Sequence, residues 1–279
     1  MLSLIVPSHR DESLERKLES LTQQTLPLSE FEVILVMLEK ERSQLRSLTR
    51  SWPLTLRTVV IPDEVANGKH MVALKRNWGA KVATSDLYML TDDDVFHTPD
   101  SLKTFVDFFA DGFRGIATCD LRFESEVVFR LGAKNTPLSN LKWVQFSTSF
   151  IVIDKATYAQ VGTFKDDFKG RGADIDYGYR AHKLGIPMKR LAGDYAVHEG
   201  SPRNDFAVGK TSGYGAYLAS REHGSDYALA LGVHPVSLTL KSLAFKLGLS
   251  RLFTTNYYKD YERGYLQGAL EARNESSKR

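Results

Sequence analysis

The chain has 279 residues, of which 42% are hydrophobic and 25% charged, and its formal net charge is +3 at pH 7. This length allows a substantial buried core, in one large domain or in a domain with an appendage. The weak positive charge without a basic block argues against nucleic-acid binding, and the single cysteine, Cys119, excludes an intramolecular disulfide and a thiolate metal cluster.

The N-terminus and the distribution of apolar residues indicate a cytoplasmic protein. The apolar run at residues 2–6 is too short for a signal peptide, and no basic region precedes it. We find no stretch of the ~20 apolar residues that a membrane-spanning helix needs. A single cysteine also fits a reducing compartment.

Strands and helices alternate along the first half of the chain. Four apolar runs predict buried strands, at residues 2–6, 31–38, 56–61 and 87–91. Apolar residues at helical spacing predict helices, at residues 13–24, 71–82 and 101–109. Leu45 and Leu48 indicate a further short helix. This alternation is typical of an α/β fold in which helices flank both faces of a mostly parallel sheet.

The second half continues the pattern and then becomes helical. Further strands are expected at residues 116–121, 126–131, 144–154 and 188–197. Further helices are expected at residues 155–161, 174–184, 206–222, 235–249 and 256–273. Because the composition changes after Pro202, we expect an α/β domain at residues 1–204 and a C-terminal helical region at residues 205–279 that packs on it.

One part of the helical region has two interpretations. Residues 238–253 mix Leu, Phe and Ala with Lys241, Lys246 and Arg251. A basic amphipathic helix can lie on an anionic membrane surface, which would make the protein peripheral at the membrane. The alternative, which we favour, is a helix packed on the main domain with its Lys and Arg side chains at the edge.

The strand at residues 87–91 ends in three adjacent carboxylates, Asp92, Asp93 and Asp94. Three neighbouring negative charges repel one another, so a positive partner is expected there. In open α/β sheets, ligands bind at the carboxyl ends of the strands. In an extended chain Asp92 and Asp94 would face the same way, and such a pair suits a hard divalent cation with bound phosphates. The alternative is a solvated acidic turn.

Several separated motifs together resemble glycosyltransferase family 2, whose members are nucleotide-sugar-dependent enzymes of the GT-A fold. In the family's order they are LSLIVPSHR at residues 2–10, KRNWGA at 75–80, a DxD metal site at 92–94, Pro99-Asp100, and an acceptor-side block formed by VGTF at 161–164 and GADIDYGYR at 172–180. His198 ends a strand where many members have a third metal ligand. The resemblance covers about residues 1–200.

The resemblance implies a metal-assisted sugar transfer. Asp94 and His198, with Asp92, would hold a divalent cation, and carboxylate and imidazole ligands favour Mn²⁺ over Mg²⁺. Asp174 aligns with the family's catalytic base and would deprotonate the acceptor hydroxyl. A base and a leaving group on opposite faces of the sugar would invert the anomeric configuration. The nucleotide sugar would contact Pro7, Ser8, His9, Arg10, Glu39, Arg76, Asp92 and Asp93.

Two positions depart from the family's pattern. After its second strand the family commonly has Asp-Asp-Gly-Ser, in which an aspartate holds the nucleotide base, whereas this chain has Met37-Leu38-Glu39-Lys40. Glu39 therefore rebuilds the base contact or the contact is lost, and the base of the donor stays open, with a UDP-sugar favoured. Ala173 replaces the glutamate that is usual in the acceptor-side block.

The predicted site residues also have structural interpretations. Asp174 could cap the helix that follows it, His198 could be an ordinary histidine at a strand end, and Arg76 could pair with a carboxylate on a helix surface. Each would then contribute to folding and not to a reaction.

Three functions stay open. The first is an inverting, metal-dependent glycosyltransferase that acts on a polysaccharide, a lipid-linked glycan or another glycan, with a polysaccharide pathway favoured by family analogy alone. The second is a sugar nucleotidyltransferase, against which the glycine-free loop at residues 7–11 argues. The third is a non-catalytic carbohydrate-binding relative, which the altered base-binding segment and Ala173 would allow.

Overall fold

The computed structural model describes residues 1–123, 128–129, 139–167, 171–199, 206–249 and 259–277. The chain divides into two compact units, of which the first is Met1–Asp166 with Arg180–Pro202 and the second is Asp167–Tyr179 with Arg203–Arg279. The second unit thus includes residues 167–179, which the sequence prediction assigned to the α/β domain. The functional division into domains stays a prediction.

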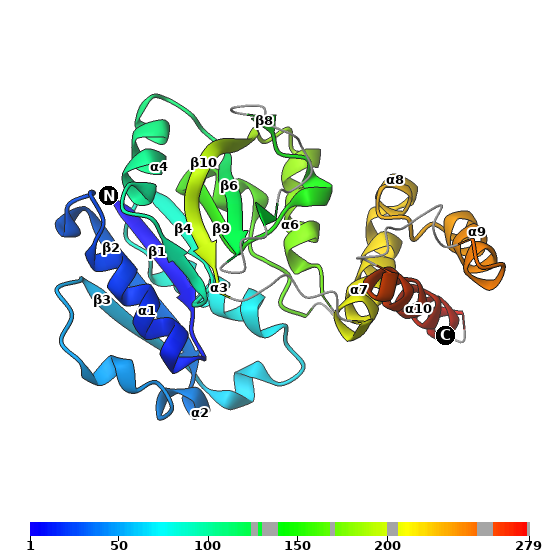
Figure 1. Ribbon diagram of the computed structural model, residues 1–279, viewed down its shortest axis with the longest axis horizontal. Helices are drawn as coiled ribbons and strands as arrows, with labels where there is room; N and C mark the ends of the chain where they lie inside the picture. The colour runs from blue at the N-terminus through cyan, green and yellow to red at the C-terminus, as the bar shows by residue number, and fades with distance from the viewer. Residues whose placement is uncertain (124–127, 130–138, 168–170, 200–205, 250–258, 278–279) are drawn as a thin grey trace. The chain divides into compact units, whose positions relative to one another are not determined.

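One sheet forms the centre of the first unit (Figure 1). Its strands are β1 (Leu2–Pro7), β2 (Phe31–Leu38), β3 (Leu56–Ile61), β4 (Leu87–Thr91), β5 (Val95–His97), β6 (Ile116–Phe123), β7 (Val128–Phe129), β8 (Ser139–Asn140), β9 (Phe150–Asp154) and β10 (Met188–His198). The strand order is β3-β2-β1-β4-β9-β6-β10-β5, while β7 pairs with β6 and β8 with β10.

Helices connect these strands and cover the sheet. They are α1 (Asp11–Thr22), α2 (Glu39–Arg42), α3 (Met71–Val82), α4 (Ser101–Ala110), α5 (Lys155–Val161) and α6 (Ala173–Lys183). The short helix predicted around Leu45 and Leu48 is a 3₁₀ helix, Arg46–Thr49. Helix α6 runs from the second unit into the first, since the boundary between the units falls after Tyr179.

The predicted α/β class is confirmed: most paired residues of the sheet run parallel, and an antiparallel strand is inserted among them. Strands β3, β2, β1 and β4 run parallel, whereas β9 lies antiparallel between β4 and β6. An apolar run reveals that a strand is buried but not its direction, so the antiparallel insertion could not be read from the sequence.

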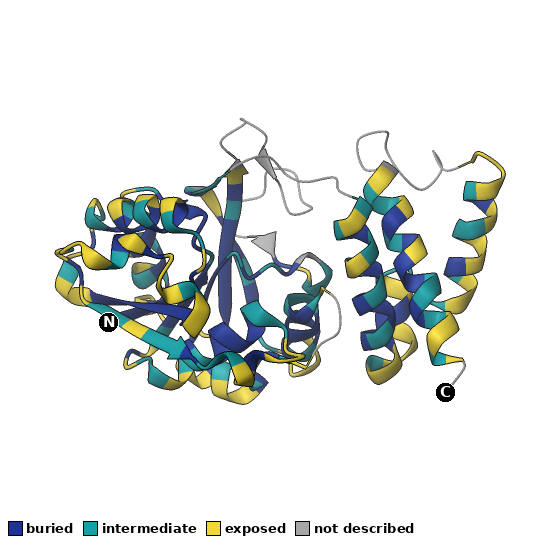
Figure 2. Ribbon diagram, turned by 90° about the horizontal axis from the view of Figure 1, so that it is seen from below, coloured by how far each residue is buried: buried dark blue, intermediate teal, exposed yellow. Residues whose placement is uncertain are grey.

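Strand β1 lies at the centre of the core, because helices pack on both of its faces. All residues of β1 and β2 are buried (Figure 2). Leu4 belongs to the same hydrophobic cluster as Leu14 of α1. Ile5 points to the opposite face, where a Cβ on Gly79 of α3 would lie only 2.3 Å from Ile5 Cγ2. Glycine at this position therefore allows α3 to approach the sheet closely.

The predicted elements mostly agree with the structure, and the exceptions are short or irregular. Strand β5, three residues long, was not predicted, and the strand expected at 144–154 begins only at Phe150, after a 3₁₀ helix at Trp143–Gln145. Most of the strand expected at 126–131 lies outside the described residues.

The second unit contains the C-terminal helices α7 (Phe206–His223), α8 (Ser225–Ala230), α9 (Pro235–Lys246) and α10 (Lys259–Ser276). Helices α7 and α10 pack with their backbones close together. A Cβ on Gly213 would lie 1.9 Å from Tyr265 O, and one on Gly264 would lie 2.1 Å from Phe206 O. Helix α8 was not predicted, because six residues are too few to show a helical period.

Hydropathy adds a feature that the sequence analysis missed. Among the described residues, Ser225–Lys246 is long and apolar enough to cross a membrane, by length and composition only. In the structure this stretch is divided into α8 and α9 by a turn that contains Gly232 at a φ of 66°.

Candidate active site

The pairing of three strands brings the predicted site residues of the first unit to one edge of the sheet. Strands β1 and β4 are parallel, with Ile5 opposite Leu90, so the residues that follow the two strands meet at the same edge. Strand β10 arrives from the other side: it runs antiparallel to β5, with His198 opposite Val95. The backbone N–H of Glu199 donates to Asp94 O over 2.8 Å.

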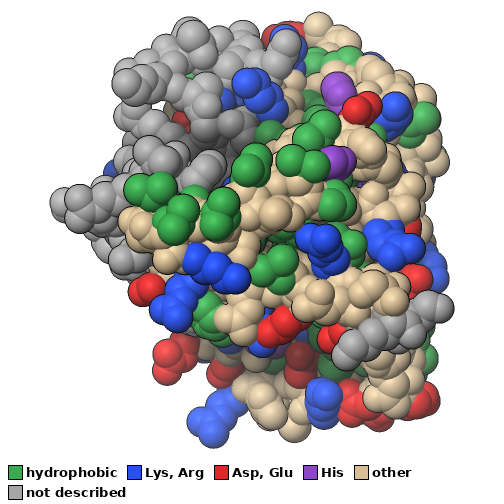
Figure 3. Space-filling view, turned by 90° about the vertical axis from the view of Figure 1, so that its right-hand side faces the viewer, with side chains coloured by type: hydrophobic (Ala, Val, Ile, Leu, Met, Phe, Trp, Pro, Cys, Tyr) green, Lys and Arg blue, Asp and Glu red, His purple; other side chains and the backbone are tan. Residues whose placement is uncertain are grey.

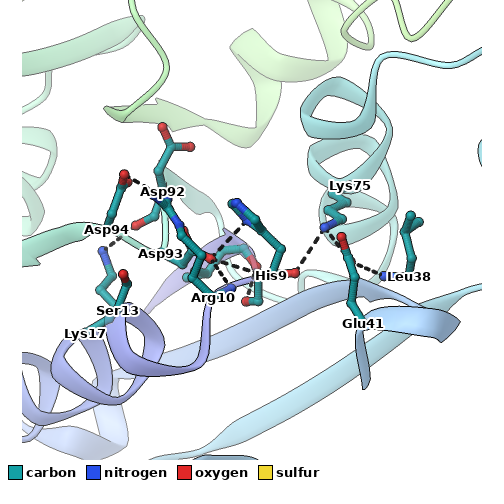
Figure 4. A network of polar contacts seen from close by, with 12 residues as sticks. His9, Arg10, Ser13, Lys17, Leu38, Glu41, Lys75, Asp92, Asp93 and Asp94 are labelled. Carbon is teal, nitrogen blue, oxygen red and sulfur yellow. Dashed lines mark hydrogen bonds and ion pairs between the residues drawn. The ribbon is translucent and has the colours of Figure 1, made fainter. Parts of the chain in front are cut away.

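Each carboxylate of the acidic triplet has a cationic partner, and Figure 4 shows Arg10 next to Asp93 and Asp94. Asp92 Oδ1 lies 2.6 Å from Arg76 Nη2, and Asp93 Oδ1 lies 2.5 Å from Arg10 Nη2. The same Arg10 nitrogen lies 2.7 Å from Asp94 Oδ2. Residues 93 and 94 form a turn, so the chain here is not extended as the sequence prediction assumed.

Asp93 holds the loop that follows β1. Its side chain is 1% exposed, and its Oδ2 accepts hydrogen bonds from the backbone N–H groups of His9 (2.9 Å) and Arg10 (3.2 Å). Burial alone would raise the pKa of Asp93, but the hydrogen bonds and charges of His9 and Arg10 outweigh it and lower the pKa to about 2. The carboxylate therefore stays ionised and fixes the position of residues 9 and 10.

The other residues predicted after β1 differ in exposure. Pro7 and Ser8 are buried, and Ser8 is tied to β2 because its N–H donates to Val36 O over 2.8 Å. The side chains of His9 and Arg10 are 50% and 41% exposed. The two exposed side chains are thus the ones that a ligand at this edge can reach.

Asp94 and His198 form the pair that was predicted to hold a metal. His198 Nε2 lies 3.7 Å from Asp94 Oδ2, while His198 Nδ1 lies 2.8 Å from Glu199 O. The other carboxylate oxygen, Asp94 Oδ1, is buried and has no hydrogen-bond partner within the part of the chain that the structure describes. Burial raises the pKa of Asp94, and the charges of His198 and Arg10 oppose this increase.

These two residues fit a cation whose remaining ligands come from a bound molecule. A buried carboxylate oxygen without a partner is costly, and a cation would satisfy it. If Nδ1 of His198 carries the proton, its Nε2 lone pair is directed to the cation site. In the described ranges no group of three or more His, Cys, Asp or Glu residues is placed to hold a metal, so Asp94 and His198 would need phosphate or water oxygens to complete the coordination.

Three successive polar side chains of α3 bind the backbone of segments that lie near this edge of the sheet. Arg76 is buried, and its Nη2 donates to Thr148 O (2.9 Å) as well as to Asp92. Asn77 holds Phe164 at both backbone groups, with distances of 2.8 and 2.9 Å. Lys75 Nζ donates to Ser8 O over 3.0 Å. Arg76 does pair with a carboxylate, as the structural interpretation held, but inside the protein and not on a helix surface.

Near the predicted base contact, Glu39, it is the neighbouring Glu41 whose carboxylate is held at the end of β2. Glu39 is exposed, whereas Glu41 Oε2 lies 2.7 Å from both Leu38 N and Lys75 Nζ, next to the carboxyl end of β2. Helix α2, four residues long, begins at Glu39. Because this helix was not predicted, the direction of its side chains could not be assigned from the sequence.

Lys17 is a second residue that the sequence analysis missed. It is completely buried beneath the acidic turn, where Nζ lies 2.5 Å from Val95 O, 2.7 Å from Thr91 Oγ1 and 3.3 Å from Asp92 O. Burial lowers the pKa of Lys17 to about 7, although the three aspartates oppose this. The sequence could have predicted that Lys17 is buried, because it lies on the same helical face as Leu14 and Leu21.

Asp174 belongs to the second unit. Helix α6 begins at Ala173, so Asp174 lies within the first turn and is not the N-cap residue, and its Oδ1 accepts a hydrogen bond from Ile175 N over 2.9 Å. Two residues later, Asp176 is completely buried, and its Oδ1 lies 2.6 Å from His223 Nε2 of α7. Asp176 lies within the GADIDYGYR motif, but no role was predicted for it from the sequence.

Solved structures with a similar fold are glycosyltransferases. The mannosyltransferase PcManGT from Pyrobaculum calidifontis, in complex with GDP-Man and Mn²⁺, is 17% identical with a TM-score of 0.66, and the match covers 100% of this chain and 88% of that one. S. aureus TarS 1-349 in complex with UDP-GlcNAc is 16% identical with a TM-score of 0.59, covering 98% and 92%. At these identities the likeness concerns the fold alone, and it confirms the predicted GT-A fold.

Sequence comparison extends the likeness to characterised relatives. Validoxylamine A glucosyltransferase from Streptomyces hygroscopicus subsp. limoneus is 28% identical over 225 residues, which cover 67% of this chain and 49% of the relative. The chain thus spans about half the length of the first curated relatives that it matches. The family model described as Glycosyl transferase family 2 matches residues 3–164, which are more than half of the chain. The chain belongs to glycosyltransferase family 2.

Proposed function

We propose that this protein transfers a sugar from a nucleotide diphosphate sugar to an acceptor hydroxyl, with a divalent metal and with inversion of the anomeric carbon. The observation that carries the proposal is the buried Asp94 Oδ1 without a hydrogen-bond partner among the described residues, beside His198 at the carboxyl edge of the sheet. A site with an unsatisfied carboxylate oxygen and a nearby imidazole is suited to a cation that also binds a diphosphate.

The donor side is assigned to the first unit. Asp94 and His198 would hold the metal, with Asp92 at its water shell, and the metal would stabilise the negative charge of the leaving diphosphate. Arg76 supports an anion site, since its Nε is buried and has no acceptor among the described residues. Mn²⁺ is favoured over Mg²⁺ because the ligands are a carboxylate and an imidazole, and the PcManGT complex contains Mn²⁺.

The acceptor side is assigned to Asp174, which would take the proton from the attacking hydroxyl. It lies in the first turn of α6, where the positive end of the helix dipole interacts favourably with a carboxylate. Attack from the face opposite to the leaving group inverts the anomeric configuration.

The nucleotide base of the donor is proposed from the residues at the end of β2 and from the ligands of the similar structures. TarS was solved with UDP-GlcNAc and PcManGT with GDP-Man, and we keep a UDP-sugar as the first choice. The base would lie at the end of β2, where Glu39 is exposed and Glu41 is held by Lys75. The acceptor would be a polysaccharide, a lipid-linked glycan or another glycan, and the enzyme would act in the cytoplasm.

A thermal-shift series tests the donor site. Nucleoside diphosphates and their sugars are added with and without Mn²⁺, because a ligand that binds only the folded state raises the melting temperature. We expect a metal-dependent increase with one base, and its loss in Asp94→Ala. Asp111→Ala removes an exposed aspartate and serves as the control. No increase with any nucleotide would contradict donor binding and favour a carbohydrate-binding relative.

A second experiment tests the reaction itself. Asp174→Asn is expected to keep the metal-dependent donor binding but to lose transfer, whereas full activity in this variant would contradict the assignment of the base. The released product distinguishes a glycosyltransferase from a nucleotidyltransferase, because a glycosyltransferase releases a nucleoside diphosphate. Release of pyrophosphate would instead indicate a nucleotidyltransferase.

A further inference from the structure

Helix α9 has hydrophobic residues on both of its faces. Leu238 and Ala244 are buried against the other C-terminal helices, and Leu238 belongs to a hydrophobic cluster with residues of α7 and α10. On the other face the exposed fractions are 59% for Val236, 58% for Leu240 and 53% for Leu243. A helix on the surface of a soluble domain normally presents polar residues to solvent, so this exposed apolar face needs an explanation.

The exposed residues form one continuous stripe. Val236, Leu240, Leu243 and Leu247 follow one another at intervals of four, three and four residues, which places them on one side of the helix. We call these four residues the α9 stripe. Leu229 of α8 and Leu249 after α9 are also about half exposed. Single exposed leucines are normal on protein surfaces, whereas a contiguous set marks an interaction site.

The charge around the stripe indicates what it binds. No Asp or Glu occurs in the sequence between Asp226 and Asp260, while Lys241 and Lys246 lie within α9. On the side of the molecule that carries α9 and α10 in Figure 1, hydrophobic side chains lie next to Lys and Arg side chains, and Asp and Glu side chains occur on the same face (Figure 3). An apolar stripe with only positive charge along its helix is complementary to an anionic lipid surface, where leucines enter the headgroup region and lysines meet phosphates.

The geometry excludes the other way in which such a stretch meets a bilayer. A spanning helix needs ~20 continuous residues to cross a hydrocarbon core of ~30 Å. Helix α9 has 12 residues and α8 has six, and the turn at Gly232 separates them. Irregular backbone exposed to lipid is not tolerated within the hydrocarbon core. This segment can therefore lie on a membrane but cannot cross it in this conformation.

We propose that the α9 stripe, Val236, Leu240, Leu243 and Leu247, docks this protein on the surface of an anionic membrane. The inference does not depend on the proposed sugar transfer, because it rests on the exposed face of α9 and on the charge of its segment. In this proposal α9 packs with one face on its neighbouring helices and binds lipid with the other, and the packing of residues 238–253 on the main domain stays the alternative prediction.

Flotation of the whole protein with vesicles tests the proposal. We expect binding to vesicles of phosphatidylcholine with phosphatidylglycerol, at least tenfold weaker binding to phosphatidylcholine alone, and weaker binding at high salt. Leu240→Gln with Leu243→Gln removes apolar area from the stripe without adding charge, and Lys241→Gln with Lys246→Gln removes two positive charges. Both double variants are expected to lose most of the binding, whereas Lys103→Gln, on α4, should bind like the wild type.

Two outcomes would overturn the proposal. If the wild type binds neither kind of vesicle, the stripe is not a lipid-binding surface. If light scattering instead shows a dimer that Leu240→Gln with Leu243→Gln dissociates, the stripe is an interface between two copies of the chain. Because the substituted leucines are exposed, the variants are expected to fold, and an unchanged melting temperature verifies this before the vesicles are added.

Discussion

Asp176 Oδ1 lies 2.6 Å from His223 Nε2, and this contact joins α6 to α7. The Asp176 side chain is completely buried, and a buried carboxylate is stable only with partners. The His223 ring also packs against Tyr179 and Tyr227, with centroid distances of 4.8 and 4.9 Å. The turn of α6 that carries Asp174 is thus held by the C-terminal helices, which gives them a role in positioning the proposed base.

We therefore predict that His223→Ala destabilises the second unit by about 3 kcal/mol, because it removes a partner of a buried charge. Hydrogen exchange is expected to accelerate at the amides of residues 173–179. Asp176→Asn and the double variant complete a double-mutant cycle, in which the double variant should cost less than the sum of the two single ones. Additive effects in urea denaturation would show that the two side chains are not coupled.

Lys17 gives a second prediction, because it donates to the turn that carries the acidic triplet. Lys17→Met keeps much of the side-chain volume but removes the donors to the carbonyl groups of Asp92 and Val95. We expect a loss of about 3 kcal/mol in the free energy of unfolding and a smaller metal-dependent thermal shift with the donor. Lys103→Met, on the exposed side of α4, is the control. Equal stability of the two variants would contradict this role.

The sequence predicted much of this edge, and the parts that it missed have identifiable physical causes. The acidic triplet was predicted because it follows an apolar run, whereas Arg76 and His198 were predicted from the resemblance to glycosyltransferase family 2. Lys17 was overlooked because a lysine on an apolar helical face is usually assigned to solvent. Glu41 depends on a four-residue helix, and a helix of that length has no period that a sequence pattern can show.

In the fold, too, the features set by local sequence were predicted, whereas the features set by contacts between distant segments were not. Strands β1, β2, β3 and β4 were predicted because each is a short apolar run between polar turns. The antiparallel direction of β9 depends on contacts between distant segments, which no local pattern encodes. The proximity of His198 to Asp94 follows from β5, a strand of three residues that the sequence does not distinguish from a turn.

The lowered pKa of Glu32 leads us to predict that the stability of the protein depends on pH. Burial alone would raise the pKa of Glu32, but hydrogen bonds from Ser3, Thr84 and Arg57 outweigh it and lower the pKa below its usual value of 4.5. Since the unfolded state then binds the proton more readily, Glu32 contributes stability above pH 4.5 that is lost as the pH falls through its lower folded pKa. Relative to Glu32→Gln, we expect an advantage of about 1–2 kcal/mol at neutral pH.

Urea denaturation of the wild type and Glu32→Gln at a series of pH values measures this difference, in which the other titrating groups cancel. The gap between the two proteins should narrow below about pH 4.5, near the ordinary pKa of a glutamate. A gap that stays constant down to acid pH would mean that the pKa of Glu32 is not lowered by folding.

The close packing of α7 and α10 gives the last prediction. Replacing glycine by alanine inside a helix normally stabilises it by about 0.5–1 kcal/mol. At Gly213 the added methyl group would lie 1.9 Å from Tyr265 O, and a backbone oxygen cannot rotate away as a side chain would. The two helices must therefore separate, and we expect Gly213→Ala to lower the free energy of unfolding by about 1–3 kcal/mol.

A substitution two residues away serves as the control for Gly213→Ala. Thr211 is exposed on α7, so Thr211→Ala should change stability by no more than about 0.5 kcal/mol. Urea denaturation of both variants gives the comparison. If Gly213→Ala were as stable as the wild type or more so, the separation between α7 and α10 would have to be larger than the structure places it, and close backbone packing would not be what holds the C-terminal helices together.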